Sequence, residues 1–247
     1  MHISLQAETI GYLFSIPITN SLILSLLTAF VLVGGGLLAT YSLKVIPGRA
    51  QGTVEVVVDG MLSFMTQTLG SLELAKKFFP LVATIFLFVL ANNWIGILPG
   101  TGSIGFFETS HGEQTFVPFF RSANSDLNTT FALALVTMFA IHLSAVVKLG
   151  PVKHLSKFII LTKGPVYFFV GLLEAVGELA KVLSFSFRLF GNIFAGEVLL
   201  VIVMTLVPLL APFPFILLEF FVGFIQALVF AMLTLIFLKI ATQEVEH

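Results

Sequence analysis

Long apolar segments dominate this chain and constrain what it can fold into. Five of them reach the roughly 20 residues that an α-helix needs to cross about 30 Å of bilayer hydrocarbon. They cover residues 18–42, 78–98, 127–148, 165–207 and 213–241. Hydrophobic residues make up 57% of the 247 residues, charged residues only 10%, and the mean hydropathy is +1.07. A soluble core cannot bury so much apolar surface, so we expect an all-α integral membrane protein with five transmembrane helices.

A sixth segment, residues 51–72, has a different pattern. Its apolar residues recur at helical spacing, while Glu55, Asp59, Ser63 and Thr66 take the other face. This pattern is typical of an amphipathic helix that lies at the membrane interface. Together the six segments predict a single membrane domain over residues 1–247.

The basic residues predict the orientation. If the sixth segment lies at the interface, nine of the twelve basic residues fall on one side of the membrane. These nine are Lys44, Arg49, Lys76, Lys77, Lys148, Lys153, Lys157, Lys163 and Lys239. Positive charge accumulates in cytoplasmic loops, so the N-terminus is predicted outside and the C-terminus in the cytoplasm. A bacterial plasma membrane is the favoured location, with an organellar energy-coupling membrane as the alternative.

The last two spans are too long to stand upright. At a rise of 1.5 Å per residue, residues 165–207 measure about 64 Å as a helix and residues 213–241 about 43 Å. The proline-rich stretch between them predicts a tight turn. We therefore expect two long, tilted helices joined in a hairpin, with residues 165–241 as the functional core. Kinks, or ends that protrude into water, are the alternative.

Arg188 is the least expected residue in these spans. Arginine keeps its charge in proteins, and at mid-bilayer it costs at least about 2.5–3.5 kcal/mol on insertion scales. On a helix that turns 100° per residue, it belongs to a polar stripe of the fourth span. The other members are Glu174, Glu178, Lys181 and Asn192, while Glu197 faces roughly the opposite way. For Glu178 and Lys181 a structural salt bridge is the alternative interpretation.

The polar residues of the spans also sort by depth. In the predicted orientation the outer half holds Asn92, Asn93, Asp126, Asn128, Glu197 and Glu219, with Gln226 near the middle. The inner half holds Glu174, Glu178 and Lys181. Two aqueous half-channels that do not meet are therefore predicted, with Arg188 between them. Arg188 repels a cation and attracts a carboxylate from a partner. We therefore expect an ion to bind a mobile carboxylate from one half-channel and to be released into the other.

Plainer roles stay open for several of these residues. Asn92 and Asn93 also suit hydrogen bonds between helices, Asp126 suits a helix N-cap, and His142 suits a structural role. No phosphate loop, nucleophile motif or metal-ligand cluster is found in the sequence. Cysteine is absent, which excludes disulfides, and a net charge of -1 gives no nucleic-acid footprint. We expect no catalytic site, cofactor or metal.

Four motifs give the chain a resemblance to a known family. They are SFRLFGNIFAGE at residues 186–197, IQALVF at 225–230, NWIGILP at 93–99 and SDLNTT at 125–130. From about residue 75 onward the chain resembles subunit a of the F-type ATP synthases, the membrane stator that faces the rotating c-ring. The resemblance implies that ATP chemistry takes place in a separate head. It also implies that the two long helices follow the c-ring and that peripheral-stalk b subunits pack on other faces.

The same resemblance implies roles for single residues. Arg188 takes the place of the essential arginine, which meets the deprotonated c-ring carboxylate. The polar partners of this arginine correspond to Asn192 and Gln226. The two residues that line the entry half-channel correspond to Glu197 and Glu219, and those toward the cytoplasmic exit to Glu174 and Lys181. Many members carry an acid and a histidine where this chain has two glutamates. Two close carboxyl groups do not readily ionise together, so we expect this pair to share one proton.

Two other classes of function are weighed against this one. A secondary transporter binds an anionic substrate at such an arginine, but these proteins often show internal repeats. No convincing repeat is found here, and five crossings suit no simple duplication. An inert assembly scaffold does not explain carboxylates that are sorted by depth. The translocated ion is predicted to be H⁺, with Na⁺ as the alternative.

Overall fold

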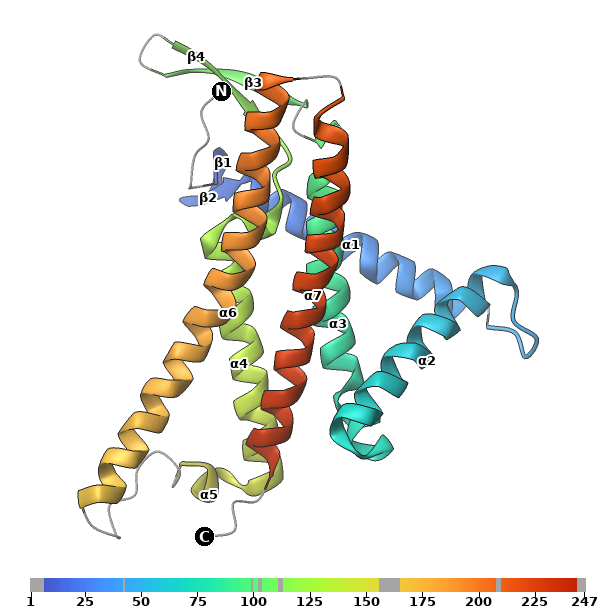
Figure 1. Ribbon diagram of the computed structural model, residues 1–247, viewed down its shortest axis with the longest axis vertical. Coiled ribbons are helices and arrows are strands. Elements are labelled where there is room, and N and C mark those ends of the chain that lie inside the picture. Colours follow the sequence, from blue (N-terminus) through green and yellow to red (C-terminus); the bar gives the residue numbers. More distant parts are fainter. Residues whose placement is uncertain are drawn as a thin grey trace.

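Five long apolar helices form the body of the molecule (Figure 1). They are α1 (Asn20–Tyr41), α3 (Leu72–Ile97), α4 (Leu127–Leu149), α6 (Pro165–Leu206) and α7 (Pro212–Thr242), and all five are long and apolar enough to cross a membrane. The computed structural model describes residues 7–41, 43–98, 100–101, 104–110, 113–155, 165–207 and 210–243. Lys157, Lys163 and Pro99, which were used above, lie outside these ranges. The prediction of an all-α integral membrane protein is confirmed.

Helix α2 (Arg49–Leu69) precedes α3 as expected, but α3 begins at Leu72 rather than at residue 78. Its start is set by a cap, because Ser71 Oγ accepts a hydrogen bond from Leu74 N at 3.4 Å. Gly70, with φ at 74°, separates the two helices in the left-handed conformation common at helix ends. The prediction followed the apolar run, which two lysines interrupt, and therefore missed the first turns.

Two short β-hairpins, which the sequence did not predict, lie toward one end of the molecule (Figure 1). Strand β1 (Thr9–Leu13) pairs with β2 (Ile16–Thr19), and β3 (Gly105–Ser110) pairs with β4 (Glu113–Pro118), both antiparallel. Phe14 and Ser15 turn the first hairpin with φ values of 47° and 76°. Such turns are usually marked by Asn-Gly or a similar pair. Neither residue type is present there, so the sequence carried no turn signal.

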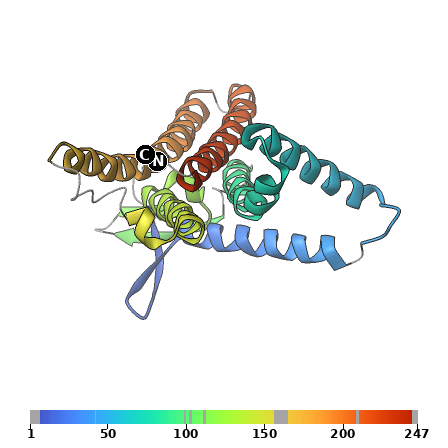
Figure 2. The same cartoon turned by 90° about the horizontal axis from the view of Figure 1, so that it is seen from below.

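The long helices α6 and α7 form the expected hairpin. Helix α6 is continuous over 42 residues, and α7 has 31. They run side by side toward the end that carries the β-hairpins, and the N-terminal half of α6 diverges from α7 toward the other end (Figures 1 and 2). Helix α3 packs along α7, and α4 packs along α6. The first turns of α6 leave a face for lipid or a partner, where Val166, Phe169 and Leu173 are 71%, 62% and 70% exposed.

Helices α1 and α2 form an arm that leads away from this bundle. Figure 2 shows their connection far from the other helices. The last turns of α1 expose Leu37, Leu38 and Tyr41, which are 67%, 76% and 91% accessible. A short helix, α5 (Pro151–Leu155), follows α4 at the end opposite the β-hairpins. The interfacial position of α2 stays a prediction.

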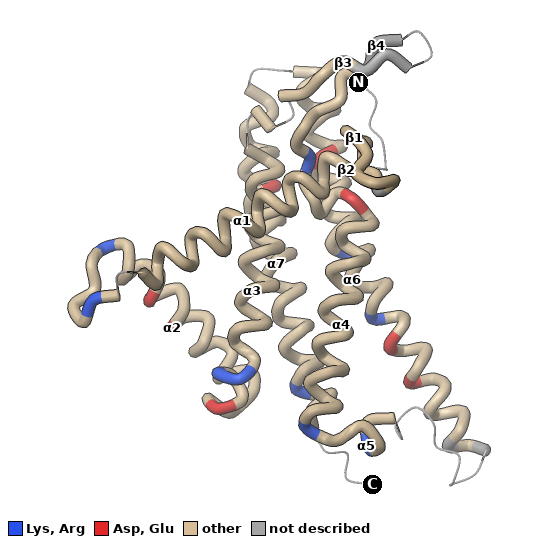
Figure 3. Tube along the Cα trace, turned by 180° about the vertical axis from the view of Figure 1, so that it is seen from behind, with Lys and Arg blue, Asp and Glu red and all other residues tan. Residues whose placement is uncertain are grey.

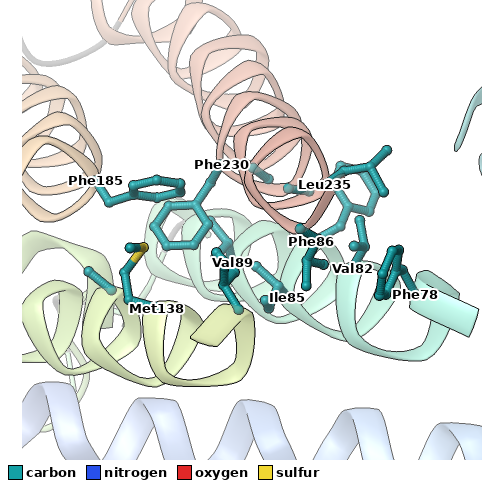
Figure 4. Close-up of a cluster of buried hydrophobic side chains, with 14 of the residues drawn as sticks. Phe78, Val82, Ile85, Phe86, Val89, Met138, Phe185, Phe230 and Leu235 are labelled. Carbon is teal, nitrogen blue, oxygen red and sulfur yellow. The ribbon is translucent and has the colours of Figure 1, made fainter. Parts of the chain in front are cut away.

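A core of aromatic and aliphatic side chains joins α3, α4, α6 and α7 (Figure 4). Phe185 of α6 meets Phe230 of α7 edge to face, with their ring centroids 4.6 Å apart. Met138 of α4 and Val89 of α3 complete the contact, and all four side chains are buried. The core therefore fixes α6 against α7 within one turn of Arg188.

Replacing Phe230 with alanine is expected to destabilise the bundle by about 3–5 kcal/mol, because it leaves a cavity under Phe185. Phe221→Ala is the matched control on the same helix, since Phe221 is 63% exposed. The measurement is unfolding of the purified protein in mixed micelles. An equal loss of unfolding free energy in the two variants would contradict the role given to this core.

Candidate ion-translocation site

Charged positions occur in both halves of α6 (Figure 3). We define the hairpin-side cluster as Asn92, Asn93, Arg121, Asn124, Asp126, Glu197 and Glu219. The α5-side cluster consists of His142, His154, Glu174, Glu178 and Lys181. Arg188 lies between them on α6. At 1.5 Å per residue it is about 10 Å from Lys181 and about 14 Å from Glu197 along the helix axis.

The segment that enters α4, residues 121–126, is buried throughout, although connecting segments usually lie on the surface. Its six residues are at most 8% exposed. It contains the 3₁₀ turn η2 (Ala123–Ser125) and packs against α1, α3, α4 and α6. Gly96 of α3 permits this packing, because a Cβ there would lie 2.5 Å from Ser122 Cβ. A loop thus forms the centre of the hairpin-side cluster.

An ion pair ties this loop to α6. Arg121 Nε lies 3.2 Å from Glu197 Oε1 and donates a hydrogen bond to Ser125 Oγ at 3.2 Å. Arg121 is 8% exposed and Glu197 33%. Arg121 was not among the predicted site residues.

Glu219 of α7 completes the predicted acidic pair. It is 6% exposed, and its carboxylate packs directly against Gly196, where a Cβ would overlap it. Glu197 follows Gly196 on α6, and its charge acts on Glu219. Within the described ranges no Lys, Arg or His forms an ion pair with Glu219. The two predicted carboxyl groups therefore lie together. Of the two, only Glu197 forms an ion pair with a cation of the described residues.

Buried asparagines connect this pair to α3. Asn93 donates to Gly223 O of α7 at 2.8 Å and accepts from Asn124 Nδ2 at 2.7 Å. The predicted interhelical hydrogen bond is thereby confirmed for Asn93, whereas Asn92 donates to Phe88 O on its own helix. Asn92 Oδ1 and Asn124 Oδ1 are buried and accept no hydrogen bond from the described residues. Ordered water commonly satisfies such acceptors.

Asp126 has the capping role that the sequence predicted. Its Oδ1 accepts from Asn128 N at 3.1 Å at the start of α4, and its Oδ2 accepts from Ser21 Oγ of α1 at 3.1 Å. Asn128 itself is exposed, and its Nδ2 lies 3.4 Å from the same Oδ1. Asp126 is 4% exposed, so it joins α1 and α4 beneath the loop.

Arg188 projects from the exposed face of α6. Its Nη2 donates to Ser184 Oγ at 3.2 Å, and Asn192, one turn on, is exposed as well. A cavity of about 10 Å³ beside Arg188 is lined by Gln226 of α7, the predicted polar partner, together with Phe185, Leu189, Phe230 and Leu233. Three of these, Phe185, Leu189 and Phe230, are at most 4% exposed. An apolar layer thus lies directly behind the arginine.

The α5-side cluster lines a cavity of about 180 Å³ between α4, α5, α6 and α7. Lys181 Nζ donates to Glu178 Oε1 at 2.7 Å and lies 4.9 Å from the centre of the Phe237 ring. The predicted Glu178–Lys181 salt bridge is confirmed. Lys181 consequently turns into the cavity, while Arg188 and Asn192 stay on the open face. Glu174 also lines the cavity, so the predicted stripe divides at Lys181.

Comparison with known proteins identifies the family of the chain. The sequence pattern of the family "ATP synthase A chain" matches residues 21–239. ATP synthase subunit a of Geotalea daltonii is 35% identical over 84% of this chain and 81% of its own length. ATP synthase subunit a 1 of Pelobacter propionicus is 38% identical over 84% of this chain and 80% of its own length. ATP synthase subunit a of Campylobacter jejuni RM1221 is 34% identical over 87% of this chain and 87% of its own length.

These features define an integral membrane protein that keeps charged groups inside its helical bundle. The chain belongs to the ATP synthase A chain family. It is therefore a membrane-sector subunit of ATP synthase that takes part in proton transport within a complex of several subunits. This membership decides against the secondary transporter and the inert scaffold.

Gly196→Ala is expected to push the Glu219 carboxylate away from Glu197, because the added methyl group occupies its place. A displacement of about 1 Å at a reacting group costs up to about 10²-fold in rate, so proton-driven ATP synthesis should fall strongly. Gly34→Ala is the control, since a Cβ there meets nothing within 4 Å. Normal synthesis in the Gly196 variant would show that this contact is not needed.

Proposed function

We propose that this subunit forms two offset half-channels that load and unload carboxylates of a c-ring. Ion flow through them is coupled to rotation of the ring and to ATP synthesis in a separate head. The observation that supports this proposal is the separation of the hairpin-side and α5-side clusters by buried Phe185, Leu189 and Phe230. Polar side chains lie on both sides of Arg188 along α6, and the layer behind it is apolar.

The hairpin-side cluster serves as the entry half-channel in this proposal. Asp126, Asn128 and Asn92 form its outer part, and the unsatisfied Asn92 and Asn124 oxygens offer positions for water. Arg121 neutralises Glu197, so Glu219 is the member of the pair on which the shared proton resides. From Glu219 the proton passes toward Gln226 and the face of α6.

The α5-side cluster serves as the exit. Glu174, Glu178 and Lys181 line its cavity, which opens between α4, α6 and α7. Positive charge on Lys148, Lys153 and Lys239 lies toward this end of α4, α5 and α7. By the positive-inside bias this end is cytoplasmic, which places the C-terminus inside and the β-hairpins outside.

Arg188 blocks a direct passage between the two. Its permanent charge repels a proton or sodium ion where the local dielectric is low. The same charge attracts a deprotonated ring carboxylate, and Asn192 and Gln226 offer further hydrogen bonds beside it. The ion crosses this level only when it is bound to a moving carboxylate.

The open face of α6 suits close contact with the ring helices. Exposed Ala180, Ser184, Arg188, Gly191 and Ala195 recur one turn apart along it, and small residues allow helices to approach closely. The apolar arm of α1 and α2 offers a separate surface, on which we place the peripheral-stalk b subunits and lipid.

Arg188→Ala is expected to abolish proton-driven ATP synthesis while the complex still assembles, with passive proton leak equal to or greater than that of the wild type. The loss follows from removing the charge barrier and the attraction for the ring carboxylate. The measurement is ATP synthesis and proton leak in the same membrane vesicles. Arg49→Ala is the control, because it removes a cation from exposed α2. Unchanged synthesis in the Arg188 variant would make this residue structural.

Glu219→Gln is expected to change the dependence of proton-driven synthesis on the pH of the entry side, because one titrating member of the pair is lost. Synthesis is compared in vesicles in which only that pH is varied. Glu73→Gln, at the exposed start of α3, is the control. An unchanged pH profile would count against proton sharing by Glu197 and Glu219.

A further inference from the structure

Two histidines from different elements meet in the α5-side cavity. His142 of α4 lies with Nδ1 3.2 Å from Nε2 of His154 on α5. Its other ring nitrogen, Nε2, lies 3.7 Å from Glu178 Oε2 of α6. The sequence analysis gave His142 a structural role and did not consider His154.

The geometry places His142 as a bridge. One ring nitrogen faces a carboxylate and the other faces a second imidazole that is 8% exposed. A neutral imidazole accepts a proton at one nitrogen and carries one at the other, and its charge changes near physiological pH. A side chain placed in this way can take up a proton on one side and release another on the opposite side.

We propose that His142 and His154 form the terminal proton relay of the inner half-channel. The proposal rests on the proposed function, because it needs protons to leave through this cavity. A proton that arrives along Glu178 is taken up at Nε2 of His142. The proton on Nδ1 then passes to Nε2 of His154, and His154 gives up the proton on its own Nδ1 to water at the α5 end, so one proton enters the pair and one leaves it. His154 Nδ1 is buried, so this release needs a movement of the ring. A ring rotation then turns the protonated Nε2 of His142 away from Glu178, so that the next proton is taken up at Nδ1.

The Glu178 contact needs a small movement or one water molecule. A separation of 3.7 Å exceeds a hydrogen bond, and contacts of this length are commonly bridged by water. The cavity of about 180 Å³ has room for such a molecule. Glu178 also stays anchored while it donates, because Lys181 holds its other oxygen at 2.7 Å.

Charged groups face the pair from helices α6 and α5. Helix α6 contributes the carboxylates of Glu174 and Glu178 and the ammonium of Lys181, which leaves one excess negative charge beside the histidines. Helix α5 contributes His154 itself. The residues of α7 that line the cavity, Phe237, Ile240 and Ala241, carry no titratable group. Lys153 of α5, next to His154 in sequence, adds a positive charge, so the pair lies among charges of both signs.

The test compares His142→Ala with Leu143→Ala, which removes a half-exposed side chain from the same turn of α4. Proton flux of the whole complex is measured in vesicles while the pH on the α5 side is varied. The His142 variant is expected to lose about a hundredfold in flux at neutral and alkaline pH, at the low end of what a positioned proton-transfer group contributes. Imidazole added on the α5 side is expected to restore part of that flux.

His142→Gln keeps the polar contacts of the ring but cannot relay a proton, so it covers the case in which the alanine variant does not assemble. It is expected to assemble and to show the same loss, and His154→Gln is expected to resemble it. Wild-type flux with an unchanged pH profile in His142→Gln would overturn the relay. Loss of flux at every pH without rescue by imidazole would also overturn it. Either result would leave the Arg188 leak experiment, and with it the two half-channels, intact.

Discussion

The positive charge of Arg188 is the constraint on which the rest of this structure depends. It stands on the open face of α6, with buried Phe185, Leu189 and Phe230 behind it. An uncompensated charge in hydrocarbon is expensive, so its surroundings need to supply a partner that carries the opposite charge. The acidic residues of α6 lie elsewhere, since Glu197 pairs with Arg121 and Glu178 with Lys181. No carboxylate of the described residues pairs with Arg188, and the proposed function assigns it to a carboxylate from outside the chain.

Hydrogen bonds between different helices hold the polar interior around this arginine together. Asn93 links α3 to α7 through Gly223 O, Asn124 links the buried loop to Asn93, and Thr130 bonds to Ser186 between α4 and α6 at 3.1 Å. Irregular backbone is tolerated at such places only where protein surrounds it. The loop at residues 121–126 meets this condition, and it carries the cation that makes Glu197 and Glu219 unequal.

Much of this fold follows from local properties of the sequence. The five spans were found because apolar length is a property of a continuous segment, and the Asp126 cap was found because a cap involves near neighbours. The contacts that were missed join distant residues: Arg121 and Glu197 are 76 positions apart. His142 and His154 approach only because α5 folds back against α4, which no periodicity predicts. The division of the polar stripe at Lys181 depends on α4, α5 and α7 lining a cavity beside one part of α6, which the spacing along α6 does not predict.

The measurement that tests the two separate half-channels most directly is side-specific thiol labelling, since the chain has no cysteine of its own. Cysteine is introduced at Gly177 in the α5-side cavity, at buried Asn92 in the hairpin-side cluster, and at Leu189 in the apolar layer. A membrane-impermeant thiol reagent is applied from one side at a time. We predict that Gly177→Cys reacts only from the α5 side, Asn92→Cys only from the opposite side, and Leu189→Cys from neither. Labelling of Gly177→Cys and Asn92→Cys from the same side would mean one continuous pore and would contradict the account.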